Sequence, residues 1–291
     1  MGALAHQSIA CQRRGRPWSR RVQPLFASLA VALILLVYAA VSSQGASARE
    51  AFPDIVDRVR PAIVAVGAAY PRRQPIGDRA PYRIRGTGFA VLDGLHIVTN
   101  DHVLPEKLDT DRRETIAVFV GRGREARVRP ARLLARDEDH DLAVLQIDGV
   151  PLATLPLADD KAVREGEAIA ITGFPIGAVL GFFPATHRGF VAALTPMARA
   201  ADRGRQLSAV QRARLRDPFD VYQLDIVAYP GNSGSPVYRV ADGALIGVVN
   251  SVFVKESRES ALTSPSGITY AIPLRHVQAL LRPATGEEAD S

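Results

Sequence analysis

Cysteine is almost absent from this sequence, whose 291 residues include only Cys11. A single thiol cannot form a disulfide within the chain, and the body after residue 48 has no thiolate nucleophile and no cysteine ligand for a metal. Aromatic residues are also few, at 6%, whereas apolar residues make up 47%. Stability must therefore come from packing of mainly aliphatic side chains, and the length suits one large or two small packed units.

A strong charge excess is lacking in the body, although the whole chain carries a formal net charge of +6. Five arginines lie in the first 48 residues with no acid among them: Arg13, Arg14, Arg16, Arg20 and Arg21. Without them, 31 of the 36 basic residues remain, against 30 acidic residues. The basic pI therefore does not indicate a nucleic-acid partner, and we expect none.

An apolar run follows these arginines at residues 25–41, and the small residues Ala46-Ser47-Ala48 come soon after it. The length of the run lies between that of a long signal-peptide core and that of a short transmembrane helix. Cleavage near Ala48 and a retained inner-membrane anchor therefore both stay open. In either case the positive-inside tendency places the body in the periplasm, or more generally outside the cytoplasm.

The body, residues 49–282, contains two series of short β-rich runs separated by turn residues, of which Asp93-Gly94 is the clearest hairpin signal. They predict two all-β units, at about 62–150 and about 163–273, joined by a linker at 151–162. Short helices are expected at 51–60 and 273–281, and an acidic disordered tail at 283–291. The arginine-rich segment 196–216 is either a solvated helix or loop, or a regulatory insertion.

Ser233 lies in Tyr229-Pro-Gly-Asn-Ser-Gly-Ser-Pro-Val237, where a glycine follows the serine and another precedes it by two residues. Such a tight loop can hold one hydroxyl outward and turn backbone N–H groups toward it. Gly231 can adopt backbone angles closed to other residues, so its N–H and that of Ser233 can form an oxyanion hole. An ordinary turn between strands is the alternative from these residues alone.

A serine nucleophile needs a base, and the base needs an acid that orients it. His102 is the candidate base, because Val98-Thr-Asn-Asp-His-Val103 places it where a strand ends and a short helical turn begins. Asp141 is the candidate acid because it adjoins the buried-strand pattern of residues 142–147, and Asp139 is the alternative. The other histidines considered, His96, His187 and His276, lie in positions typical of packed or exposed side chains.

Seven motifs occur in the order seen in trypsin-like serine proteases, and the chain most closely resembles the bacterial HtrA (Deg) type. They are Gly86-Thr-Gly-Phe89, Val98-Thr-Asn-Asp-His-Val103, Asp141-Leu-Ala-Val-Leu145, Gly173-Phe-Pro175, Tyr229-Pro-Gly-Asn-Ser-Gly234, Gly247-Val-Val-Asn250 and Gly267-Ile-Thr-Tyr-Ala-Ile-Pro273. The resemblance covers nearly the whole exported body. It implies two chymotrypsin-like six-stranded antiparallel β-barrels, with the site in the cleft between them and a short C-terminal helix. His102 and Asp141 then come from the first barrel and Ser233 from the second.

The residues and the resemblance together predict a serine endopeptidase that acts on exported or misfolded polypeptides, without a metal or an organic cofactor. The expected walls of the first specificity pocket are Val227, Ala228, Tyr229, Asn250, Ser251 and Val252. Because no acid is among them, we expect a small or medium aliphatic residue before the cut.

Two alternatives remain open. One is a latent or inactive protease-fold module that binds extracytoplasmic peptides by strand addition. The other is an esterase, but that class is expected on an α/β sheet with a Gly-x-Ser-x-Gly elbow, which Asn232-Ser233-Gly234 does not match.

The sequence departs from the HtrA pattern in three places. Ser235 stands where many members have a second glycine, and the segment 196–216 is longer than the usual connection. The printed chain also ends soon after the terminal helix, so we expect no C-terminal PDZ domain. Homo-oligomer formation is left open.

Overall fold

The computed structural model describes residues 51–70, 82–158, 163–176, 181–196, 219–250 and 268–285. Twelve strands in these ranges form two closed barrels of six strands each, and every pairing between them is antiparallel. The predicted all-β class with two six-stranded barrels is thus confirmed. Four expectations concern residues outside these ranges: the leader 1–48 with its apolar run, most of the segment 196–216, the pocket residues Ser251 and Val252, and the end of the tail.

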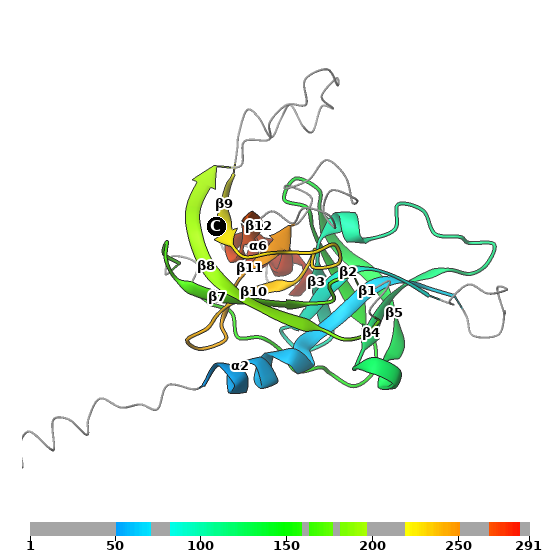
Figure 1. Ribbon diagram of the computed structural model, residues 1–291. Coiled ribbons are helices and arrows are strands. Elements are labelled where there is room, and N and C mark those ends of the chain that lie inside the picture. Colours follow the sequence, from blue (N-terminus) through cyan, green and yellow to red (C-terminus); the bar gives the residue numbers. More distant parts are fainter. Residues whose placement is uncertain are drawn as a thin grey trace, which may run out of the picture. The chain divides into compact units, whose positions relative to one another are not determined.

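The first barrel has the strand order β1-β2-β3-β6-β5-β4. Its strands are coloured from blue through cyan to green in Figure 1. Its strands are β1 (Ile63–Ala69), β2 (Tyr82–Val91), β3 (His96–Thr99), β4 (Thr115–Val120), β5 (Arg127–Asp137) and β6 (Leu142–Ile147). The Asp93-Gly94 turn joins β2 to β3 as expected. Gly94 has a positive φ of 79°, and Asp93 Oδ1 accepts a hydrogen bond from the Leu95 N–H at 2.9 Å.

The second barrel has the order β10-β11-β12-β9-β8-β7. Its strands are β7 (Ala168–Gly173), β8 (Ala185–Pro196), β9 (Asp220–Asp225), β10 (Pro236–Arg239), β11 (Leu245–Asn250) and β12 (Ile268–Pro273). In both barrels most strands that are consecutive in sequence pair with each other, and the exceptions are β3 with β4 and β9 with β10. The loops at the strand ends are therefore free to carry functional side chains.

The two barrels share a core, which is why strand β1 is buried along its whole length. Val64 and Val66 point into the interior of the first barrel, whereas Ile63 and Ala65 belong to an apolar cluster that also contains second-barrel residues such as Leu245. A strand with both faces covered has no need of polar alternation. The linker joins the barrels further, since the Leu155 N–H donates to Ala90 O and the Ala158 N–H to Leu245 O.

Two helices flank the barrels. Helix α2 (Phe52–Val59) buries Ile55, Val56 and Val59. Helix α6 (Leu274–Thr285) follows the last strand of the second barrel and also contacts β5 and β6 of the first. It continues to Thr285, three residues into the expected tail, although it contains Pro283, which lacks the N–H that a helix normally uses. Over the ranges given above, the structure contains no helix long and apolar enough to cross a membrane.

Candidate active site

His102 is carried by the short 3₁₀ turn Asp101–Val103, directly after strand β3, as the sequence predicts. Asn100 keeps the extended backbone of the strand, and the chain then turns at Asp101. Two hydrogen bonds tie this turn to the β5–β6 connection: the Asn100 amide and the Asp101 N–H both donate to the Asp141 carbonyl oxygen, at 3.0 and 3.2 Å. These two contacts to the Asp141 carbonyl fix the turn that carries the histidine independently of the His102 side chain.

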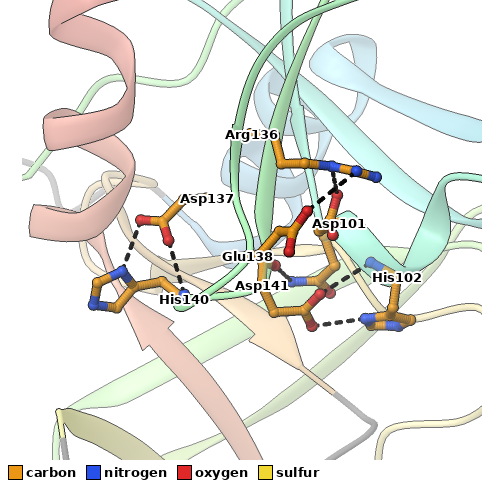
Figure 2. A network of polar contacts seen from close by, with 8 residues as sticks. Asp101, His102, Arg136, Asp137, Glu138, His140 and Asp141 are labelled. Carbon is orange, nitrogen blue, oxygen red and sulfur yellow. Dashed lines mark hydrogen bonds and ion pairs between the residues drawn. The ribbon is translucent and has the colours of Figure 1, made fainter. Parts of the chain in front are cut away.

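Asp141 presents both carboxylate oxygens to the residues around it (Figure 2). Oδ1 accepts a hydrogen bond from the His102 N–H at 2.9 Å, and Oδ2 lies 2.7 Å from His102 Nδ1. Asp141 has a positive φ of 54°, a left-handed conformation that aspartate tolerates better than most residues. Because an ionised carboxylate only accepts hydrogen bonds, Nδ1 carries the ring proton and Nε2 is left as the basic nitrogen.

Asn250 completes the surroundings of this carboxylate from the second barrel. Its amide Nδ2 donates to Asp141 Oδ2 at 2.6 Å, and the residue is wholly buried at the end of β11. Sequence reasoning expected Asn250 as a wall of the specificity pocket and missed this contact. A polar residue that ends an otherwise apolar strand was the available signal. The alternative acid Asp139 is exposed and does not share these contacts.

A second layer of charged contacts brackets the turn that carries Asp141, as Figure 2 shows. Arg136 Nε donates to Asp101 Oδ1 at 2.6 Å, so strand β5 is linked to the turn that carries His102. Burial raises the pKa of Asp101 above its ordinary value, although the nearby Arg136 opposes this. On the other side His140 Nδ1 lies 2.7 Å from Asp137 Oδ2, and its ring stacks on that of His276 in α6 with centroids 3.9 Å apart.

Ser233 lies in the loop between β9 and β10 and is 5% exposed. Gly231 and Gly234 have positive φ values of 100° and 83°, so glycine is required at both positions. A Cβ on Gly231 would also lie 2.3 Å from Phe174 O, and one on Gly234 would lie 2.1 Å from Thr87 O. The glycines thus let the loop pack directly against two other backbone segments.

Four consecutive carbonyl groups of this loop, at residues 230–233, accept hydrogen bonds. Their donors are Ile176 N–H for Pro230 at 2.6 Å, Thr87 Oγ1 for Gly231 at 2.7 Å, Ser235 N–H for Asn232 at 3.0 Å and Thr87 N–H for Ser233 at 2.9 Å. In a trans peptide the N–H points away from the preceding carbonyl. The Gly231 N–H therefore points away from Ile176, and the Ser233 N–H points away from Ser235.

The three expected pocket residues before the serine loop are half-buried and uncharged, whereas Asn250 is wholly buried. Val227, Ala228 and Tyr229 follow one another before the serine loop. The Tyr229 ring lies 5.8 Å, centroid to centroid, from the ring of His187 in β8. Burial lowers the pKa of His187, so its imidazole tends to stay neutral beside this loop.

Comparisons with known proteins agree with this architecture. Residues 86–248 match the model of the trypsin-like peptidase domain family. A probable periplasmic serine endoprotease DegP-like of Halomonas elongata is 28% identical over 199 residues, which is 68% of this chain and 34% of the relative. A protein of the same description from Rhizobium meliloti is 32% identical over 209 residues, or 69% of this chain and 34% of the relative. The chain thus spans about a third of the length of these curated relatives.

Among solved structures, the HtrA-type protease AlgW with decapeptide superposes with a TM-score of 0.57 at 23% identity, covering 81% of this chain and 68% of that one. This likeness agrees with the two-barrel fold. The family match extends over more than half of the chain, from the glycine before Thr87 to β11. The chain therefore belongs to the trypsin-like peptidase domain family.

Proposed function

We propose that the protein hydrolyses peptide bonds in exported or misfolded polypeptides, with Ser233 as nucleophile, His102 as base and Asp141 as orienting acid. Ser233 Oγ attacks the peptide carbonyl carbon while His102 Nε2 takes the hydroxyl proton. The imidazolium then gives that proton to the leaving amine, and the acyl-enzyme forms. Water attacks the acyl-enzyme by the same route, which releases the second product and restores Ser233.

One observation carries the proposal: the His102–Asp141 pair and the serine loop are both tied to the seam between the barrels. His102 Nδ1 lies 2.7 Å from Asp141 Oδ2, and Asn250 of the second barrel bonds the same oxygen. The serine loop reaches the first barrel in return, because the Thr87 N–H donates to Ser233 O. A base with a fixed tautomer and a loop with a strained, fixed backbone are what serine-dependent acyl transfer needs.

The Gly231 and Ser233 N–H groups form the oxyanion hole in this proposal. The hydrogen bonds accepted by the carbonyls of Pro230 and Asn232 support this assignment. Because each carbonyl points toward its donor, the N–H of the same peptide, that of Gly231 or Ser233, points the opposite way. Removing one such donor in a related setting reduces turnover by about 10²–10³-fold.

The substrate preference follows from the pocket residues. Val227, Ala228 and Tyr229 carry no charge. We expect cleavage after a small or medium aliphatic residue rather than after lysine or arginine. Assay of the purified protein on a mixture of peptides, with the cut sites read by mass spectrometry, checks this preference.

The place of action in this proposal is outside the cytoplasm. The arginine-rich start, the apolar run 25–41 and the small residues at 46–48 support export, and the relatives described as periplasmic agree with it. Mass measurement of the N-terminus of the exported protein distinguishes cleavage near Ala48 from retention of the run as an inner-membrane anchor.

The alternative of a peptide-binding module with little turnover is not favoured, because the His102–Asp141 contact would serve no purpose in strand addition. Labelling with a fluorophosphonate probe tests the choice. The expected result is labelling of the wild-type protein and none of the Ser233→Ala variant. A folded wild-type protein that stays unlabelled would contradict the proposed mechanism.

A further inference from the structure

Thr87, in strand β2, is wholly buried and bonds across the seam between the barrels. Its N–H donates to Ser233 O at 2.9 Å, and its hydroxyl donates to Gly231 O at 2.7 Å. The same hydroxyl accepts the Phe174 N–H at 2.9 Å, at the end of β7. The hydroxyl of this first-barrel residue thus bonds both the serine loop, at Gly231, and the segment after β7, at Phe174, in the second barrel.

The carbonyl of Thr87 connects in the other direction, toward His102. It accepts a hydrogen bond from Thr99 Oγ1 at 2.7 Å. Thr99 is the last residue of β3, and the next residue, Asn100, bonds the Asp141 carbonyl. A series of hydrogen bonds through Thr87 and Thr99 therefore connects the backbone around His102 and Asp141 to the backbone around Ser233.

Glycines lie where the backbone around Thr87 approaches the serine loop and the end of β7 most closely. A Cβ on Gly86 would lie 2.9 Å from Ser233 O, and one on Gly173 would lie 2.8 Å from Thr87 Oγ1. The space between Gly173 and the hydroxyl therefore has no room for a Cβ. A hydroxyl is the small group that can donate to one neighbour and accept from another at the same time. Valine has the same shape as threonine but can do neither.

We propose that the Thr87 hydroxyl is a positioning group for catalysis, which fixes the peptide between Gly231 and Asn232 and so holds the oxyanion N–H groups in register with His102. This inference rests on the proposed function and adds a residue to it. Thr87 itself touches no reacting atom. It acts through Gly231, so its loss should impair the chemical step more than substrate binding.

Three variants test this. Thr87→Val removes the hydroxyl and keeps the shape, and Thr87→Ser keeps the hydroxyl. Thr172→Val is the matched control, because Thr172 is also buried and its hydroxyl makes two hydrogen bonds, to Thr186 Oγ1 at 2.9 Å and Tyr238 OH at 2.8 Å, neither of which involves the serine loop. For each variant kcat and KM on a peptide substrate, the rate of fluorophosphonate labelling and the thermal midpoint are measured.

The expected result for Thr87→Val is a fall of about 10- to 100-fold in kcat and in labelling rate, with KM changed by less than about threefold. Thr87→Ser should recover most of the activity, and Thr172→Val should lose thermal stability without this loss of kcat. If Thr87→Val does not fold, Thr87→Cys, whose thiol is a weak donor and acceptor, replaces it in the comparison.

Wild-type kcat in Thr87→Val would overturn the inference, as would equal losses in Thr87→Val and Thr172→Val or a failure of Thr87→Ser to recover activity. The proposed function fails separately. If the wild-type protein neither reacts with the probe nor cleaves peptides, the mechanism itself is wrong, whatever the variants do.

Discussion

At the scale of single residues, Asp141 is the residue of the proposed mechanism whose two carboxylate oxygens must both accept hydrogen bonds. One oxygen holds the His102 backbone and the other lies against the His102 ring and the Asn250 amide. An asparagine there keeps the size but presents an N–H₂ group to one of these donors. The ring would then be turned to the wrong tautomer, with Nε2 protonated and unable to accept the serine proton.

Asp141→Asn is therefore expected to lower kcat by about 10⁴-fold at neutral pH, which steady-state kinetics measures. Asp139→Asn is the matched control, since Asp139 is an exposed aspartate two residues away and its loss should leave kcat unchanged. Comparable losses in the two variants would show that the turn as a whole, rather than the Asp141 carboxylate, is responsible.

His187 gives a pH-dependent prediction. Burial lowers its pKa, so below pH about 6.5 the unfolded chain takes up a proton that the folded chain resists. The unfolding free energy should then fall with falling pH, by at most about 1.4 kcal/mol per pH unit from this group. Chemical unfolding of the wild type and of His187→Asn between pH 5 and 8 checks this. The variant should lose less stability on acidification, and parallel curves would contradict the assignment.

Single residues were predictable from the sequence where the signal is local. His102 was chosen because it follows a strand, and Asp141 because it precedes one, and the structure brings their side chains together. The polar end of an apolar strand singles out Asn250 in the sequence but does not reveal its partner, because Asn250 is 109 positions from Asp141. That contact exists only when both barrels have closed. The catalytic roles of these residues stay predictions.

At the scale of elements, the serine loop depends on glycines that allow close backbone packing. Gly231 combines a positive φ with a Cβ position 2.3 Å from Phe174 O, so alanine there meets both strain and a clash. The loop has no room to absorb the clash, because its carbonyls are held by Ile176, Thr87 and Ser235. Displacement of the Gly231 N–H is the expected consequence.

Gly231→Ala should lower the fluorophosphonate labelling rate by at least about 10²-fold, the effect of losing one oxyanion donor. Gly166→Ala is a control for backbone strain alone. Gly166 has a similar φ of 81°, but among the described residues no atom beyond its chain neighbours lies within 4 Å of its Cβ position. It should cost some stability and leave labelling intact. Equal labelling of the two variants would argue against the Gly231 N–H as a donor.

Helix α6 is the element that connects the end of the second barrel to the first. Leu281 is 4% exposed in the shared apolar cluster, whereas its neighbour Leu280 is only partly buried. Leu281→Ala should lower the unfolding free energy by about 2–5 kcal/mol, and Leu280→Ala by less. Denaturant unfolding of both variants measures the difference. Equal effects would mean that the helix does not pack as described.

Elements were predicted well where turn residues separate them. Asp93-Gly94 marked the β2–β3 hairpin correctly, since only a few residues decide such a turn. The end of α6 was predicted too early. A proline is disfavoured inside a helix because it lacks an N–H and its ring clashes with the preceding turn, so the sequence around Pro283 does not indicate that the helix continues to Thr285.

At the scale of the whole molecule, one apolar cluster runs through both barrels. Neither barrel can therefore open without exposing residues of the other. The fold class was predictable because seven motifs occur in a fixed order along the sequence. The shared cluster was not, since strands such as β1 are apolar throughout and do not reveal which face meets which partner.

Unfolding should accordingly be a single cooperative transition. Val144 lies in the first barrel and Val248 in the second, and both are fully buried members of the shared cluster. Val144→Ala and Val248→Ala should each move the same midpoint, followed by circular dichroism and by loss of probe labelling. Two separate transitions, each sensitive to only one substitution, would show independent barrels.

The division of the site between two barrels has a consequence during synthesis. The ribosome completes the first barrel, with His102 and Asp141, before residue 233 has been added. A half-finished chain therefore holds a base without a nucleophile and cannot cut its neighbours. On the proposed mechanism, hydrolytic activity therefore requires the second barrel, whose residues are added last.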